Sequence, residues 1–244
     1  IKKRKMNSKR IKKGVIILYN LPKSLETVKF RESDADVLFQ VDAVAEALTE
    51  LKIPYKKMGI RKLGEVFSLK DMPEEIVFNL VESLPGKNNP ENSVPNLLNS
   101  IGKIHTGNNK ITLNKWVTKS ILNAHRVSTP EAVLIHLGDK FDYSSFPSGT
   151  LIVKPVSSDG SEGIEPSSVV NSEEKLKEAI ERIHTKFLQP ALVEKFIDGR
   201  ELNVSVFQYK NRIKVMPLAE IDFSKFDSSK PKIVDYAAKW VEDS

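Results

Sequence analysis

The sequence predicts an α/β protein, α+β overall, whose N-terminal part forms a Rossmann-like unit. Short apolar runs at 14–20, 55–60 and 75–80 have the length and content of buried strands. Between the first two, residues 36–51 repeat their apolar side chains at helical spacing. Strand, helix, strand and strand in this order are typical of an α/β unit.

After the third run, residues 83–95 are rich in Asn, Pro, Gly and Ser, which predicts a loop at the C-terminal end of a strand. Active-site loops occupy this place in open α/β sheets. The pattern then changes toward mixed elements. We expect a helix capped by Thr112 and reaching Leu122, followed by a strand at 149–156. A second helix begins with an Asn171–Glu174 capping box and has an apolar face at Leu176, Ala179, Ile180 and Ile183. A strand at 191–193 and a hairpin of 202–208 with 213–221 follow.

The composition excludes several classes of protein. A content of 40% hydrophobic and 29% charged residues is that of a globular protein. No apolar run is long enough for a membrane span, and no apolar segment follows the basic N-terminus as in a secretory signal. The chain has no cysteine, so disulfides, thiol catalysis and thiolate metal sites are excluded. We therefore expect a cytoplasmic protein.

The net charge of +6 belongs to one segment. Residues 1–13 contain eight of the 38 Lys and Arg residues and no acid, which leaves 30 basic against 32 acidic residues elsewhere. Such a tail binds RNA or anionic lipid in some proteins and is a solvated extension in others. No aromatic residues are interleaved with these charges to stack on bases. We favour a flexible extension and expect no specific nucleic-acid partner.

The common nucleotide and metal motifs are absent. The sequence contains no G-x-x-x-x-G-K-[ST] phosphate loop, no G-x-G-x-x-G fingerprint and no HExxH pair. Its four histidines are scattered at positions 105, 125, 136 and 184. A nucleotide site must therefore be built in another way, and we assign no metal ligand.

Lys154 is the most informative residue. It lies inside an apolar strand, directly before Pro155 and a Ser/Gly-rich loop at 157–163. A lysine in such a strand loses hydration and needs acceptors nearby, and successive backbone N–H groups of a small loop can bind a phosphate. The alternative is an edge-strand lysine that reaches water.

A second pattern runs from Leu192 to Val206. An apolar strand leads into Glu194-Lys195, then Gly199, then a strand headed by Glu201. Exposed backbone groups at 195–197 can read the edge of an adenine, and the Glu201 carboxylate can accept two ribose hydroxyls. The alternative is a surface ion pair beside a hairpin acid. A third segment, 232–240, offers Lys239 as a cation for a transferring phosphate.

Taken in order, these motifs resemble the D-alanine–D-alanine ligase branch of the ATP-grasp enzymes. The matching series is Thr106-Gly107, Asn114-Lys115, Lys154-Pro with its loop, Val193-Glu-Lys-Phe-Ile-Asp-Gly-Arg-Glu201 and Asp235-Tyr-Ala-Ala-Lys-Trp240, and the likeness runs from about Val15 to the end. It implies an ATP-grasp fold behind a Rossmann-like pre-ATP-grasp domain. The implied parts are a tail at 1–13, a substrate domain at 14–108, a central lobe at 109–195 and the start of a C-terminal lobe at 196–244.

The resemblance also implies a reaction and a set of residues. ATP phosphorylates a carboxylate, and an amine then attacks the acyl phosphate to give an amide. By this likeness Lys115 and Lys154 hold the phosphates under the loop of Ser157, Ser158, Asp159, Gly160 and Ser161, while Glu194, Lys195 and Ile197 contact adenine, Glu201 takes the ribose and Lys239 neutralises the γ-phosphate. Lys154 and Lys239 are the implied catalytic residues.

Several positions depart from the family pattern. Asp36 stands approximately where the family has a Glu for the substrate amine, and the loop after Leu80 offers Glu82 and Glu91 instead of a Gly-rich acidic loop. Tyr236 completes the substrate candidates. The loop carries Asp159 and Glu162 where small or apolar residues are usual, and Trp240 replaces a tyrosine. These departures do not support specificity for D-alanine, so we leave the substrate open and expect ligation of a related amino acid or peptide.

The family's Mg²⁺ ligands, an Asp and a Glu-x-Asn, follow the lysine of the last motif, and we expect them beyond Ser244 in a longer chain. Asp222 and Glu220 precede that lysine, and we interpret them as structural. Two other functions stay open, a non-catalytic ATP-binding module and a nucleic-acid or membrane binder that acts through the tail. A homodimer is also left open.

Overall fold

The computed structural model describes residues 13–22, 31–85, 90–107, 114–209, 212–226 and 230–241, without the side chains of 31–35, Pro90 and Tyr209. The chain divides into two compact units, Ile1–Thr112 and Leu113–Ser244. Residues 1–12 of the basic tail and the expected cap Thr112 lie outside the described residues. The domain boundaries expected at 108 and 195 remain predictions.

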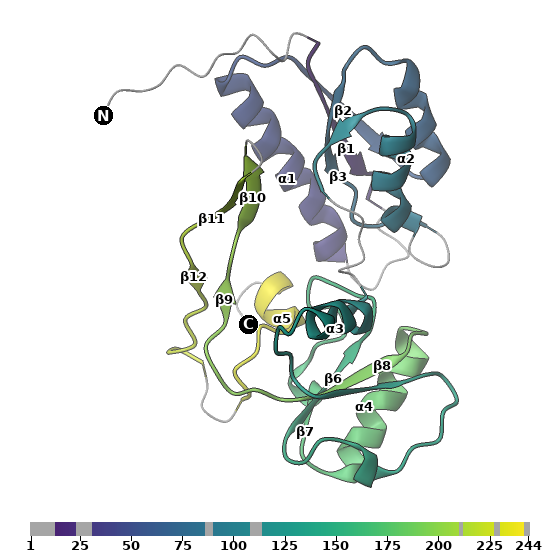
Figure 1. Cartoon of the computed structure of the whole chain (residues 1–244), viewed down its shortest axis with the longest axis vertical. Coiled ribbons are helices and arrows are strands. Elements are labelled where there is room, and N and C mark those ends of the chain that lie inside the picture. The colour runs from purple at the N-terminus through teal and green to yellow at the C-terminus, as the bar shows by residue number, and fades with distance from the viewer. Residues whose placement is uncertain are drawn as a thin grey trace. The chain divides into compact units, whose positions relative to one another are not determined.

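Unit 1 is a parallel four-stranded sheet with helices on both faces (Figure 1). The strand order is β2-β1-β3-β4. Its elements are β1 (Val15–Asn20), α1 (Arg31–Glu50), β2 (Tyr55–Ile60), a 3-10 helix (Leu63–Asp71), β3 (Ile76–Leu80), a 3-10 turn (Pro90–Ser93), α2 (Val94–Ser100) and β4 (Ile104–His105).

The two faces of β1 pack against different helices. Successive side chains of a strand point to opposite faces. Val15 and Ile17 pack with the apolar stripe of α1, whereas Ile16 and Leu18 pack with the 3-10 helix and α2. This double burial explains why β1 is a continuous apolar run in the sequence. The predicted strand-helix-strand-strand order is confirmed.

Two boundaries in unit 1 differ from expectation. Helix α1 begins at Arg31, five residues before the first position of the apolar repeat. The predicted loop at 83–95 gives way to a 3-10 turn and then to α2, with Pro95 in its first turn. Proline suits that position because the first helical N–H groups have no partner within the helix. None of the described helices combines the length and apolar character needed to cross a bilayer.

Unit 2 contains a second four-stranded sheet, of order β5-β8-β6-β7, in which all pairs are antiparallel. Helices α3 and α4 lie on opposite sides of it in Figure 1. The elements are α3 (Lys115–Ala124), β5 (Ala132–Ile135), a 3-10 turn (Tyr143–Ser145), β6 (Leu151–Pro155), a 3-10 turn (Pro166–Ser168), β7 (Val169–Val170), α4 (Glu173–Lys186), β8 (Ala191–Lys195), β9 (Leu202–Asn203), β10 (Val206–Tyr209), β11 (Arg212–Val215), β12 (Ala219–Glu220) and α5 (Tyr236–Trp240).

Both expected helix caps in unit 2 were misplaced. Asn114 caps α3 by accepting the N–H of Val117 at 3.0 Å. The cap of α4 is Ser172, which accepts from Lys175, so the capping box expected at Asn171 is wrong by one position. Asn and Ser are about equally good caps, so their adjacency left the sequence ambiguous. The expected apolar face of α4 is buried as predicted, whereas β5 was not anticipated.

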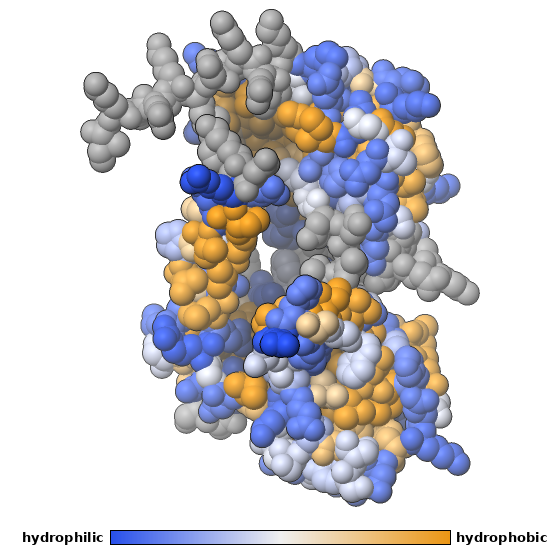
Figure 2. Space-filling model, viewed as in Figure 1, coloured by the Kyte–Doolittle hydropathy of each residue, from blue (hydrophilic) through white to orange (hydrophobic). Residues whose placement is uncertain are grey.

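The predicted hairpin is confirmed as two short ladders, β10 with β11 and β9 with β12. Its apolar residues are exposed in the described part of the chain, and Figure 2 shows the hydrophobic surface over β10 and β11. Val206 pairs with Val215, for example, and both side chains are open to solvent. The ribbon thus has paired strands and exposed apolar side chains, and an ion pair between Arg200 and Glu220 adds to the ladder of β9 with β12.

Ile183 of α4, which is fully buried against the sheet, offers a test of the unit 2 core. We expect Ile183→Ala to lower the free energy of unfolding of unit 2 by about 2–5 kcal/mol, because it leaves a cavity. Ile121→Ala on α3 is the matched control, since Ile121 is largely exposed. Both tryptophans, Trp116 and Trp240, belong to unit 2, so denaturant unfolding followed by tryptophan fluorescence reports on this unit. Equal losses for the two variants would contradict the assignment of this core.

Candidate functional site

Strands β6 and β8 carry two charged residues on the sheet face that turns away from α4. Val153 and Val193 belong to the core that packs on α4. Their neighbours Lys154 and Glu194 therefore point to the other face. The Lys154 Nζ lies 2.7 Å from the Glu194 Oε2. The sequence predicted that Lys154 needs a hydrogen-bond acceptor nearby. The acceptor in the structure is the Glu194 carboxylate of the adjacent strand.

Helix α3 brings two more lysines to this face. The N–H of Lys115 bonds to the Val156 carbonyl at 2.9 Å, which fixes the start of α3 beside the end of β6. The Lys115 Nζ donates to the carbonyl oxygens of Pro155, at 3.0 Å, and Ser158. One turn later, the Lys119 Nζ lies 2.7 Å from the Glu194 Oε1. Two ammonium groups therefore contact the Glu194 carboxylate, and a third, that of Lys115, is held by backbone carbonyls at the end of β6.

A pocket of about 240 Å³ opens beside this cluster. It brings together six of the predicted ATP-binding residues, one from α3, one from β6, three from the loop and one from the start of the β9 segment. Four apolar side chains and Glu162 complete the wall. The lining residues are Lys115, Ile152, Lys154, Ser158, Asp159, Ser161, Glu162, Ile164, Glu201, Ile233 and Val234.

The electrostatic surroundings of Lys115 favour an incoming anion. Burial lowers the pKa of Lys115, and the charge of Lys154 lowers it further, from 10.5 to about 8. Asp159, Glu194 and Glu162 act in the opposite direction without restoring it. A phosphate at this point would offset the repulsion between the two lysines and raise the pKa of Lys115.

Glu194 stays ionised at neutral pH. Burial by itself would raise the pKa of Glu194, but the charge of Lys154 and the hydrogen bonds from Lys119 and Lys154 outweigh it and hold the pKa below its usual range. Its side chain is 8% exposed. A buried carboxylate of this kind needs the two cations that contact it.

The loop at 157–163 presents unpaired backbone donors. Gly160, Ser161 and Gly163 have positive φ values of 57°, 64° and 76°. Within the described part of the chain, the N–H groups of residues 158–161 make no hydrogen bond. Successive free amides in such a turn form a concavity suited to a phosphate.

The C-terminal segment holds the loop from one side. The Ser161 hydroxyl donates to the Val234 carbonyl at 2.7 Å, and the Trp240 indole N–H donates to the Gly160 carbonyl at 2.8 Å. The N–H of Tyr236 bonds to the Ile164 carbonyl at 3.0 Å. The loop is therefore docked against the residues around α5.

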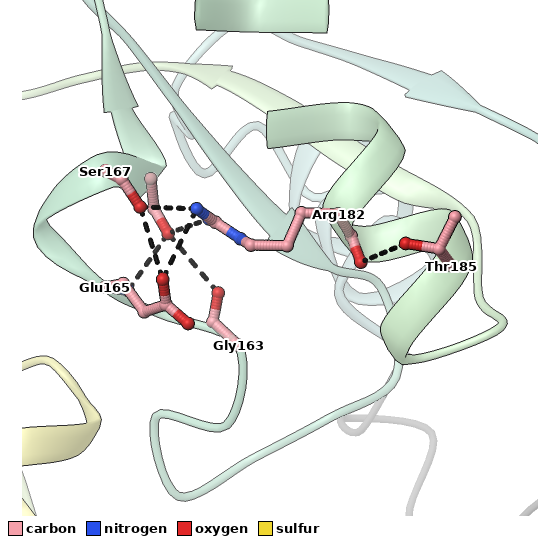
Figure 3. Close-up of polar contacts among 6 residues, drawn as sticks. Gly163, Glu165, Ser167, Arg182 and Thr185 are labelled. Carbon is pink, nitrogen blue, oxygen red and sulfur yellow. Dashed lines mark hydrogen bonds and ion pairs between the residues drawn. The ribbon is translucent and has the colours of Figure 1, made fainter. Parts of the chain in front are cut away.

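Two further side chains fix the ends of the loop. At its start, the Gln189 side chain accepts the Ser157 N–H at 2.9 Å and donates to the Ser158 hydroxyl at 3.1 Å. After its end, Arg182 of α4 donates to the hydroxyls of Ser167 and Ser168 and lies 3.5 Å from the Glu165 carboxylate (Figure 3). Ser168 in turn bonds the Gly163 carbonyl. Arg182 thereby ties the end of the loop to α4.

The predicted adenine contacts lie at the end of β8, Glu194 and Lys195, and just past it, Ile197. The N–H groups of Lys195 and Phe196 bond to the carbonyls of Glu131 and Thr150, so these two donors, which the sequence suggested were exposed, are already used. Ile197 is 60% exposed, and among the described residues its N–H has no partner. Glu201 lines the pocket.

Helix α5 carries the last predicted residues. Asp235 caps it by accepting the Ala238 N–H at 2.9 Å. Lys239 is exposed and is not among the residues that line the pocket. Tyr236 is half-buried, with its ring centroid 6.4 Å from that of Trp240. Of the three lysines expected to converge, two lie together in the pocket.

The predicted substrate acids of unit 1 fall into two groups. The Gln40 amide donates to Asp36 at 2.9 Å and to Glu82 at 3.2 Å, which brings these two carboxylates together. Glu91 is buried, and its carboxylate accepts the Leu84 N–H at 3.2 Å. Glu91 is thus turned into the protein, where it holds the loop that follows β3.

Sequence reasoning missed Lys119, Gln189 and Arg182. Lys119 had a detectable signal, since it follows Lys115 by one helical turn and must share its face. Gln189 and Arg182 had none, because their partners lie far away in the sequence. Among the described residues, no cluster of three His, Asp or Glu side chains could hold a metal ion.

Comparison with known proteins now places this site in a class. A family model described as "D-ala D-ala ligase C-terminus" matches residues 113–244. The D-alanine–D-alanine ligase of Bacillus anthracis complexed with ATP is similar in structure, with a TM-score of 0.65 and 18% identity over 89% of this chain and 69% of that one. The fold is that of the ATP-grasp ligases, as predicted.

The chain belongs to the D-alanine–D-alanine ligase family, since the family model covers more than half of it. The uncharacterized protein y4sG of Sinorhizobium fredii is 30% identical over 63% of this chain and 45% of its own length. The D-alanine–D-alanine ligase of Flavobacterium psychrophilum is 25% identical over 96% of this chain and 67% of its own length. The chain thus spans about half to two thirds of the length of these relatives.

Gly163 tests whether the loop conformation is needed. An added Cβ would lie 2.5 Å from the Pro155 Cγ and 3.0 Å from the Phe187 Cζ, at a φ of 76°. We expect Gly163→Ala to destabilise unit 2 by roughly 1–3 kcal/mol, through overpacking and backbone strain. The control is Gly199→Ala, because a Cβ there meets no atom within 4 Å. Denaturant unfolding followed by tryptophan fluorescence measures both, and an unchanged midpoint for Gly163→Ala would show that the loop adjusts freely.

Proposed function

We propose that this chain forms part of an ATP-dependent ligase that joins a carboxylate to an amine through an acyl phosphate and releases ADP. Family membership supports the class of reaction. The single observation that carries the proposal is the pocket in which Lys115, Lys154, Glu201 and the loop at 157–163 meet. Its lining combines two cations with three carboxylates, those of Asp159, Glu162 and Glu201, and the loop offers free backbone donors.

Each group has a role that its surroundings support. Lys115 and Lys154 bind phosphate oxygens, and the free N–H groups of residues 158–161 bind the same phosphates from the loop. Glu201 accepts the ribose hydroxyls, while the free N–H of Ile197 donates to the adenine base. ATP supplies the phosphoryl group, and the protein contributes positioning and charge neutralisation.

The proposal also concerns Lys239, Mg²⁺ and the substrates. A catalytic role of Lys239 needs its ammonium to reach the phosphates, and we retain it as a proposal. For Mg²⁺ the described residues offer no ligand cluster, and we assign no step to it. The substrates are proposed to be amino acids or short peptides, with Asp36, Glu82 and Tyr236 as candidate contacts, and the need for ATP favours a cytoplasmic location.

The first test is ATP binding measured by calorimetry with Lys154→Met. Loss of a charge-assisted contact to phosphate should weaken ATP binding by about 10- to 100-fold. Lys140→Met, which removes an equally positive but exposed side chain, should change it by less than about twofold. The proposal fails if wild type binds no ATP or if the two variants bind equally well. ATP binding without ADP release from any pairing of amino-acid or peptide substrates would favour a non-catalytic module.

The lowered pKa of Lys115 makes a separate prediction about protons. At pH 8 this group is about half protonated in the free protein, and bound phosphates raise its pKa, so ATP binding should take up about half a proton. The uptake should vanish near pH 6, where Lys115 is already charged. Calorimetry in two buffers of different ionisation enthalpy measures it. An uptake that persists in Lys115→Met would show that another group is responsible.

A further inference from the structure

A cluster of three charged side chains, Lys119, Glu194 and Lys154, lies beside the pocket. The function proposed so far gives no role to Lys119. Glu194 contacts two lysines at 2.7 Å, Lys119 through Oε1 and Lys154 through Oε2. The side chains of Lys119, Glu194 and Lys154 are 10%, 8% and 27% exposed. Only the most exposed of the three, Lys154, lines the ATP pocket.

Lys119 faces elsewhere. Its ammonium group donates to the Pro130 carbonyl at 2.6 Å, and its side chain lines a different hollow, of about 320 Å³, together with Trp116 and Asn123. Lys119 therefore does not touch a ligand in the ATP pocket. It can act on such a ligand only through Glu194.

The charge balance shows what this action is. Without Lys119, the ammonium of Lys154 and the carboxylate of Glu194 would be an exclusive pair. Moving Lys154 toward a phosphate would then leave a buried carboxylate without a cation, which is strongly unfavourable. With Lys119 in place, Glu194 keeps one cation whether or not Lys154 contacts it.

We propose that Lys119 is a positioning residue that neutralises Glu194 and thereby frees Lys154 to bind phosphate. Lys154 has three N–H donors, and among the described residues Glu194 is its sole hydrogen-bond partner. In the absence of phosphate, Glu194 holds the Lys154 ammonium at the wall of the pocket. When phosphate binds, Lys154 turns to it and Lys119 retains Glu194. This inference rests on the proposed function, since it names how the same site takes phosphate.

The test measures binding of inorganic tripolyphosphate and of ATP by calorimetry. Tripolyphosphate has no base or ribose, so its affinity reports only on the groups that bind phosphate, which are the lysines and the free N–H groups of the loop. Lys119→Met should weaken the binding of both ligands by about tenfold or more, because Lys154 then stays paired with Glu194. Lys119→Arg keeps the charge and should bind like wild type. Lys140→Met controls for the loss of one positive charge at an exposed site.

A second substitution separates this role from a merely structural one. Glu194→Gln removes the charge that holds Lys154, so in the Lys119→Met background it should restore tripolyphosphate affinity to within about threefold of wild type. If Lys119 only tied α3 to Pro130, the double variant would bind as weakly as Lys119→Met. That result, or wild-type affinity in Lys119→Met itself, would overturn the inference and leave the proposed function intact.

Two other results of these experiments would also decide the inference. If wild type binds neither ATP nor tripolyphosphate, the proposed function and this inference fail together. If Lys119→Met does not fold, as judged by circular dichroism, Glu194→Gln alone is the deciding variant. It should bind tripolyphosphate several-fold more tightly than wild type because Lys154 is released, and an unchanged affinity would overturn the inference.

Discussion

The site depends on one buried carboxylate with two cations. Glu194 lies on the sheet face opposite α4, and it remains there as an anion because Lys119 and Lys154 contact its two oxygens. These contacts join α3 to β6 and β8, elements that are separate in the sequence. Lys115, one turn before Lys119, is fixed beside the end of β6 by its own bonds to the Val156 and Pro155 carbonyls. A buried charge that loses a partner is costly, so the arrangement of the three elements and the charge of the pocket are set by the same interaction.

The loop at 157–163 depends on this frame and on residues far along the chain. Gln189, which follows α4, holds its start, Arg182 holds the segment after its end, and Trp240 reaches it from α5. The Trp240 indole N–H donates to the Gly160 carbonyl at 2.8 Å, so a side chain near the end of the described chain holds the backbone of the loop directly.

What the sequence could predict follows from how local each signal is. β1, β6, β8 and the apolar face of α4 carry their patterns within a few residues, and they were found. Lys154 was recognised because a lysine inside an apolar strand is unusual. Lys119 shares a helix face with Lys115, but its role was missed because it depends on Glu194 of β8, which is distant in the sequence and meets Lys119 only where α3 packs on the sheet. Motif order could not fix the direction of Lys239, since the orientation of a five-residue helix such as α5 is set by its contacts. Adjacent residues of similar propensity, as at Asn171 and Ser172, left the helix start undecided by one position.

The charges that line the pocket show why placement matters more than net charge here. Lys115 and Lys154 are matched there by Asp159, Glu162 and Glu201, so the lining as a whole does not carry a positive charge. Affinity for a phosphate must then come from the particular points where ammonium groups and free N–H groups lie, within a partly buried region where such contacts are stronger than in water. The carboxylates of the loop, through Asp159 and Glu162, already act on Lys115 in the opposite sense to Lys154. An anion that enters must therefore approach the lysines more closely than it approaches these acids. For this reason the position of Lys154 matters more for binding than the net positive charge of the chain.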